Sequence, residues 1–141
     1  LVELHRDDWD IVQSDEQADD TTDDQSPKMT PAETLFPDTI NAWQRHPEGQ
    51  VDHLTVPKGQ VELAAYDDRP DSPSQGETHS VVTGERDQNL VRIPKGVWHG
   101  IRVLSSEPAL VLNFPSELYE YYDPDIERLP ADTDEIPFEW D

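Results

Sequence analysis

Four polar side chains have the types and spacing of a reactive site. Gln44 and His46 alternate along one short segment, Asp52 follows soon after, and His99 lies much further along the chain. Side chains two residues apart share a strand face, so Gln44 and His46 point the same way if this segment is extended. Two imidazoles and a carboxylate can bind a metal ion or move a proton. Glutamine is a poor ligand in place of a third imidazole, which makes metal binding the less favoured use.

The segment around His99 has the pattern of a strand, a tight turn and a second strand. Pro94 presets φ at the first turn position, and Gly96 supplies a permissive backbone beside it. Similar short apolar or alternating runs occur at 29–36, 39–46, 51–56, 60–66, 78–83, 90–93, 99–104 and 109–114. Turn signals separate these runs, and no helical pattern lies between them. We therefore predict an all-β sandwich or barrel domain over residues 29–141.

The two ends of the chain differ from this β pattern. Residues 1–28 are predicted to form an early strand and then an acidic, mobile loop, because residues 7–27 carry nine acids and few apolar side chains. The tail, residues 115–141, is rich in Tyr, Asp and Pro and ends on Phe138 and Trp140. We expect this aromatic end to pack back on the barrel or on a neighbouring subunit.

The composition is strongly acidic. The chain has 32 acidic residues and 10 Lys and Arg residues, which gives a formal net charge of −22. No basic stripe is present, which disfavours binding to nucleic acid. The acids are spread along the whole chain, and this predicts adaptation to high salt, where screening shortens their mutual repulsion. The chain has no cysteine, no apolar run of membrane-spanning length and no signal-peptide pattern, so we expect a cytoplasmic protein without disulfides or membrane contact.

Aromatic and basic side chains near the predicted strands are suited to binding a sugar nucleotide. The aromatic faces available for stacking are those of Trp43, Trp98, Phe114, Tyr119, Tyr121 and Tyr122. Four of the ten basic residues also lie near these strands, as binding of a diphosphate would require: Arg45, Lys58, Arg92 and Arg102. The alternative is that Arg92 and Arg102 only pair with surface acids.

Several separated motifs resemble those of the dTDP-4-dehydrorhamnose 3,5-epimerases and their short relatives in surface-polysaccharide pathways. In chain order they are Ala42-Trp43-x-x-His46-x-x-x-Gln50-x-Asp52, Val56-x-Lys58-Gly59, Leu63-x-x-Tyr66-Asp67-Asp68-Arg69-x-Asp71-Ser72-Pro73, Ile93-Pro94-x-Gly96-Val97-Trp98-His99-Gly100 and Leu129-Pro130-x-Asp132-x-Asp134-Glu135-Ile136-Pro137-Phe138-x-Trp140. The resemblance runs from about residue 29 to residue 140. It implies a jelly-roll cupin (a double-stranded β-helix), a homodimer, no metal or other cofactor, and epimerisation beside the 4-keto group of a dTDP-linked sugar.

The resemblance also implies roles for individual residues. Epimerisation beside a ketone needs a base, an acid on the opposite face, and cations that hold the enolate and the diphosphate. Tyr119, or Tyr121, corresponds to the acid, and Asp132 corresponds to the carboxylate that partners the base. The residues predicted to bind substrate are Gln44, Arg45, Asp52, Lys58, Arg92, Trp98 and His99.

One departure from the family pattern leaves the activity open. The position of the catalytic base holds Gln44, and a neutral amide cannot remove a proton from carbon. Either His46 takes that role, with Tyr119 and Asp132 as the other catalytic residues, or the protein binds a sugar nucleotide without epimerising it. A metal cupin that acts on a small organic acid is a third hypothesis.

Overall fold

The computed structural model describes residues 28–141, so the predicted early strand and most of the acidic loop lie outside the described residues. Within this range the regular elements are all strands: β1 (Ala32–Leu35), β2 (Ile40–Arg45), β3 (Asp52–Lys58), β4 (Gln60–Tyr66), β5 (Thr78–Gly84), β6 (Val91–Ile93), β7 (Trp98–Val103), β8 (Ala109–Asn113) and β9 (Glu127–Arg128). The all-β prediction is confirmed.

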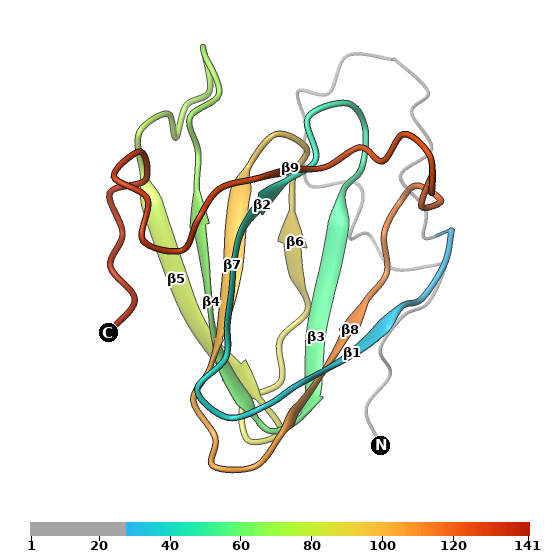
Figure 1. Ribbon diagram of the computed structural model, residues 1–141, viewed down its shortest axis with the longest axis vertical. Coiled ribbons are helices and arrows are strands. Elements are labelled where there is room, and N and C mark those ends of the chain that lie inside the picture. The colour runs from blue at the N-terminus through green and yellow to red at the C-terminus, as the bar shows by residue number, and fades with distance from the viewer. Residues whose placement is uncertain (1–27) are drawn as a thin grey trace.

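The strands form two antiparallel sheets that face each other (Figure 1). One sheet has the order β1-β8-β3-β6, and the other has the order β5-β4-β7-β2-β9. Consecutive strands repeatedly change sheet, as in a jelly roll. Most of the core lies between the sheets, where Leu54 and Val56 of β3 meet Val61 of β4 and Ile101 of β7.

The alternation of side chains along each strand explains which residues reach this core. On β7, Ile101 and Val103 are buried in the main core, whereas Trp98 belongs to a second apolar cluster. His99 shares the inward face with Ile101 because the two positions are two residues apart. The predicted turn before β7 is confirmed: Gly96 has φ of 76°, and its N–H donates to the carbonyl oxygen of His46 at 2.7 Å.

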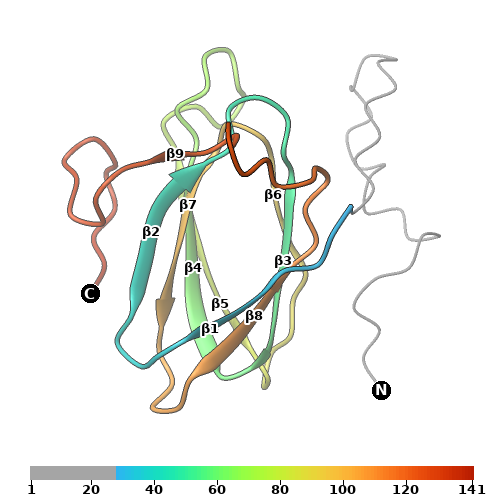
Figure 2. The ribbon, with the colours of Figure 1, turned by 45° about the vertical axis from the view of Figure 1, so that its right-hand side comes forward.

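The C-terminal segment returns to the barrel, as predicted from its aromatic end. Figure 2 shows it lying along the outside of β2. The ring of Trp43 in β2 contacts Phe138 edge-on and lies 5.0 Å from Trp140 between ring centroids. The backbones of Trp43 and Leu129 also exchange two hydrogen bonds, of 2.9 and 3.0 Å. The tail therefore covers the outer face of the five-stranded sheet.

In the part of the chain that the structure describes, no helix has the length and apolarity required to cross a membrane.

Candidate functional site

Three buried polar side chains meet at one end of the barrel. His46 follows the last residue of β2, His99 stands at the start of β7, and Asp52 is the first residue of β3 in the facing sheet. Because β2 and β7 are antiparallel, with Gln44 opposite His99, the end of one lies beside the start of the other. All three side chains are buried, so His46 is not a solvated residue at the end of its strand. We call His46, Asp52 and His99 the His–Asp–His cluster.

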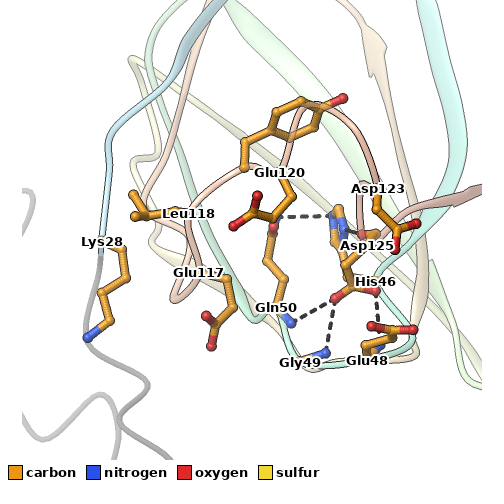
Figure 3. Close-up of a pocket in the computed structure, with 11 residues that line it drawn as sticks. Lys28, His46, Glu48, Gly49, Gln50, Glu117, Leu118, Glu120, Asp123 and Asp125 are labelled. Carbon is orange, nitrogen blue, oxygen red and sulfur yellow. Dashed lines mark hydrogen bonds between the residues drawn. The ribbon is translucent and has the colours of Figure 1, made fainter.

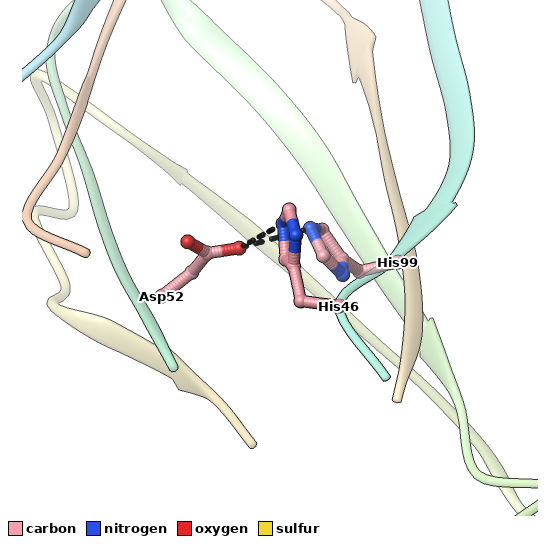
Figure 4. A group of neighbouring side chains, drawn as sticks. All are labelled: His46, Asp52 and His99. Atoms are coloured by element: carbon pink, nitrogen blue, oxygen red, sulfur yellow. Dashed lines mark ion pairs between the residues drawn. The ribbon is translucent and has the colours of Figure 1, made fainter. Parts of the chain in front are cut away.

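The carboxylate of Asp52 lies at the centre of the cluster. Its Oδ2 lies 3.0 Å from Nε2 of His46 and 3.3 Å from Nε2 of His99 (Figure 4). Its Oδ1 accepts hydrogen bonds of 2.7 Å from the side-chain amides of Gln50 and Asn113. Asp52 is 1% exposed, so these contacts replace the water that would solvate its charge at the surface.

Both imidazoles are oriented by backbone carbonyl groups. Nδ1 of His46 lies 2.6 Å from the carbonyl oxygen of Asp125, and Nδ1 of His99 lies 3.1 Å from that of Val97. A carbonyl oxygen can only accept, so each Nδ1 carries the hydrogen. Each Nε2 is then directed to Asp52. Amide groups contact both Nε2 atoms at 3.3 Å, that of Gln50 at His46 and that of Gln44 at His99.

Burial and charge shift the pKa values of this site in opposite directions. Burial favours the neutral forms, but the hydrogen bond and the negative charge of Asp52 raise the pKa of His46 above its ordinary value. Burial also disfavours the Asp52 carboxylate, but the hydrogen bonds to His46 and His99 hold the pKa of Asp52 well below its usual range. The carboxylate is therefore ionised, and positive charge is favoured beside it.

A cavity of about 480 Å³ opens next to the cluster. Its lining residues come from the 46–50 turn, the 117–125 segment and Lys28. Figure 3 shows Lys28 and Glu117 on one side, with His46 and Asp125 on the other. Tyr119 lines this cavity and is 47% exposed, whereas Tyr121 is 83% exposed and packs edge-on against the Tyr119 ring. Of the two tyrosines considered for the acid, Tyr119 is the one on the cavity wall.

Arg45 and Trp98 lie on the opposite face of the sheet from the cluster. Arg45 lies between Gln44 and His46, and Trp98 directly precedes His99. Successive side chains of a strand point to opposite faces, so the side chains of Arg45 and Trp98 point outward. The Arg45 guanidinium lies 4.4 Å from the ring centroid of Trp98 and pairs with Asp68 and Glu127. The indole N–H of Trp98 also donates to Asp68 at 3.1 Å. These two predicted substrate-binding residues therefore belong to an outer-surface network.

Three further predicted site residues are also placed away from the cluster. Lys58 is exposed at the far end of β3, about 20 Å from Asp52 at the usual rise along a strand. Arg92 of β6 lines a different cavity, of about 270 Å³. Asp132 lines a third cavity beside the tail, of about 790 Å³. The carboxylate that partners the imidazoles is Asp52, and among the described residues the cation on the wall of the 480 Å³ cavity is Lys28.

The sequence did not lead us to assign roles to Gln50, Asn113 or Asp125. Gln50 was visible within the motif that ends at Asp52, but it had no predicted role. Asn113 shares the inward face of β8 with Ala109 and Val111, and a polar residue at an inward position is a signal that could have been read. Asp125 orients His46 through its backbone carbonyl, which no sequence pattern reveals.

One family model and several known proteins match the chain. The model of the dTDP-4-dehydrorhamnose 3,5-epimerase family matches residues 42–141. The probable low-salt glycan biosynthesis epimerase Agl13 of Haloferax volcanii is 44% identical over 140 residues, covering 99% of this chain and 83% of the relative. The spore coat polysaccharide biosynthesis protein SpsL of Bacillus subtilis is 39% identical over 105 residues, covering 74% and 69%. The crystal structure of a dTDP sugar isomerase from Desulfovibrio desulfuricans G20 matches with a TM-score of 0.77 at 30% identity, covering 86% and 76%.

Proposed function

The chain belongs to the dTDP-4-dehydrorhamnose 3,5-epimerase family, and we propose that it epimerises C3 and C5 of a dTDP-linked 4-dehydro-6-deoxy sugar. Family membership makes it an enzyme of the epimerase class with a jelly-roll cupin fold. The family description and the name of the Desulfovibrio isomerase support the dTDP sugar. The Haloferax and Bacillus relatives support a role in glycan or polysaccharide synthesis. The halophilic source of the first relative agrees with the high-salt adaptation predicted from composition.

The observation that carries the proposal is the cavity of about 480 Å³ with His46 and Tyr119 on its wall. Its volume lies in the range of small-molecule sites. His46 and Tyr119 are side chains that can accept or return a proton at a carbon beside a ketone. The nucleotide-sugar substrate and the homodimer remain predictions that rest on the resemblance.

The proposed chemistry assigns proton removal to His46, because Gln44 cannot perform it. Asp52 lies beside His46 and favours the imidazolium that forms when the ring takes up a proton. The same positive charge stabilises an enolate oxygen that develops nearby. Tyr119 returns a proton to the sugar carbon. The predicted partner role of Asp132 passes in this proposal to Asp52, because Asp132 lines a different cavity.

Solvent exchange tests the proposal. The full chain is mixed with dTDP-4-dehydro-6-deoxyglucose in D₂O containing concentrated KCl, and deuterium at C3 and C5 is followed by NMR and mass spectrometry. We expect incorporation at both carbons, and a loss of about 10²–10⁴-fold in rate for His46→Ala and for Tyr119→Phe. His79→Ala and Tyr122→Phe are matched controls, because both side chains are exposed and do not line the cavity. A native chain that binds the sugar nucleotide but incorporates no deuterium would contradict epimerisation.

A further inference from the structure

The geometry of the His–Asp–His cluster gives it a second use. Nε2 of His46, Nε2 of His99 and one oxygen of Asp52 all lie within 4.8 Å of one another. Each Nδ1 is engaged by a carbonyl oxygen, so in the neutral ring each Nε2 presents a lone pair. Two lone pairs and a carboxylate oxygen therefore converge. Such a group of acceptors is favourable only when positive charge lies among them, either as protons or as a metal ion.

The spacing of these donor atoms matches what one metal ion requires. A transition-metal ion lies about 2.0–2.2 Å from imidazole nitrogen and carboxylate oxygen. In tetrahedral or octahedral geometry, neighbouring ligand atoms are then separated by roughly 3.0–3.5 Å. The two Nε2-to-Oδ2 distances of the cluster are 3.0 and 3.3 Å. The third separation, between the two Nε2 atoms, lies within 4.8 Å, so the two rings would have to close by no more than about 1–2 Å to bind one ion.

Surrounding hydrogen bonds hold the cluster in this arrangement. Metal-binding histidines usually donate their other ring N–H to a carbonyl or a carboxylate, and metal-binding carboxylates are hydrogen-bonded in turn. His46 and His99 donate to carbonyl oxygens, and Oδ1 of Asp52 accepts from Gln50 and Asn113. Oδ2 is left to face the two rings. Figure 4 shows both rings directed toward this oxygen.

The same contacts make a proton-transfer role of His46 more demanding. Nδ1 is bonded to a carbonyl oxygen and Nε2 faces Asp52, so the ring must exchange Asp52 for the substrate before it can act as a base. A ligand role needs no such exchange. Gln44 also lies at the site, since its amide is 3.3 Å from Nε2 of His99. Amide oxygen and nitrogen occupy nearly equivalent positions, so Gln44 can turn its oxygen to an ion as a further ligand.

We propose that His46, Asp52 and His99 bind one divalent transition-metal ion, of the class of Zn²⁺, Mn²⁺ or Fe²⁺. Two imidazoles and one carboxylate suit these ions better than Mg²⁺ or Ca²⁺, which prefer oxygen ligands. Three protein ligands leave coordination positions for other groups, and the adjacent cavity supplies the space. The inference shares its location with the proposed epimerisation. A bound ion would occupy Nε2 of His46, so metal binding and the proton removal proposed above are alternative uses of the same ring, and the proposed epimerisation belongs to the chain without the ion.

Binding of Co²⁺ is the direct test. The full chain is treated with a chelator, returned to concentrated KCl to suppress weak binding by the acidic surface, and titrated with CoCl₂. We expect one Co²⁺ per chain, with the visible absorption of a four- or five-coordinate site, and its displacement by Zn²⁺. Asp52→Asn and His99→Ala should abolish this spectrum, whereas His79→Ala, at an exposed position of β5, should leave it unchanged. Asn113→Ala removes a hydrogen bond to Asp52, together with the one that Asn113 Oδ1 accepts from the backbone N–H of His53, and should weaken affinity about 10–100-fold.

The outcomes separate this inference from the proposed function. Absence of stoichiometric Co²⁺ binding to the native chain overturns the metal site, as does equal binding by a folded Asp52→Asn variant. Deuterium exchange that proceeds at full rate in the chelated chain supports epimerisation and shows that the reaction does not need the ion. Stoichiometric Co²⁺ binding, together with no exchange by the chelated chain, supports the metal site and contradicts the epimerisation. Because the first measurement uses the native chain, a variant that fails to fold does not prevent the test.

Discussion

A single methyl group added at Gly100 should disturb the packing of β7 against β2 and the C-terminal tail. It lies on β7, next to His99, with β4 on one side and β2 on the other. A Cβ placed there would lie 2.3 Å from Cβ of Ala42 and 3.0 Å from Cζ2 of Trp140. Carbon atoms normally approach to about 3.5–4.0 Å. Gly100→Ala therefore requires β2 and β7 to separate by more than 1 Å at Ala42, and the Trp140 ring of the tail to shift as well.

The expected cost follows from this overlap. Overpacking of a buried position typically costs about 1–3 kcal/mol, and we expect the upper end because both clashing groups are held by neighbouring elements. For a domain of this size, about 3 kcal/mol corresponds to a fall of roughly 10 °C in the unfolding midpoint. Gly49→Ala is the matched control, since its Cβ would meet only Glu117, at 3.9 Å. Thermal unfolding in concentrated KCl, followed by tryptophan fluorescence, measures both variants. A midpoint for Gly100→Ala as high as that of the control would refute this account of the packing.

Three other predictions concern charge and the active site. The unfolding midpoint should rise with KCl well beyond 1 M, where simple screening is nearly complete, and a flat curve would contradict the high-salt adaptation. Asp67 has a pKa held below its usual range, chiefly by its hydrogen bonds with Arg69, so its contribution to stability is present above about pH 4 and is lost as the pH falls. Urea unfolding should therefore show Asp67→Asn less stable than the native chain at pH 6, and this difference should shrink by pH 3. In the His46→Ala variant, Gln44→His should raise deuterium exchange at C3 by at least about 100-fold if the substrate carbon lies near residue 44, and an unchanged rate would place that carbon elsewhere.

The strands were predictable because local signals agree with the tertiary structure. Apolar alternation and Pro- or Gly-containing turns placed β1 to β8 close to their observed bounds. β9 was missed because it has two residues, Glu127 and Arg128, and both are exposed. Its pairing with Gln44 and Arg45 depends on the tail returning to β2, and no local pattern encodes this return.

The site was predictable only in part. The period of two puts Gln44 and His46 on one face, and the turn at 94–96 puts His99 at a strand start. The structure brings these side chains into contact with one another and with Asp52. The same period puts Arg45 and Trp98 on the outer face, away from the His–Asp–His cluster. The small number of Lys and Arg residues was the only basis for predicting that they lie around one pocket. Their number does not determine the direction in which each side chain points. Lys58 shows the result, since it lies on the same strand as Asp52 but at the opposite end.

Asp125 shows how a residue without a sequence signal can hold the site together. Its carboxylate accepts hydrogen bonds from the backbone N–H groups of Glu48, Gly49 and Gln50, at 2.9–3.1 Å (Figure 3). Burial opposes its ionisation, but these donors lower the pKa of Asp125 and keep it charged. Its carbonyl oxygen meanwhile accepts from His46. Asp125 thus fixes both the turn between β2 and β3 and the direction of the His46 imidazole. The separation of His46 from Asp52 therefore depends on the segment after β8 as much as on β2 and β3.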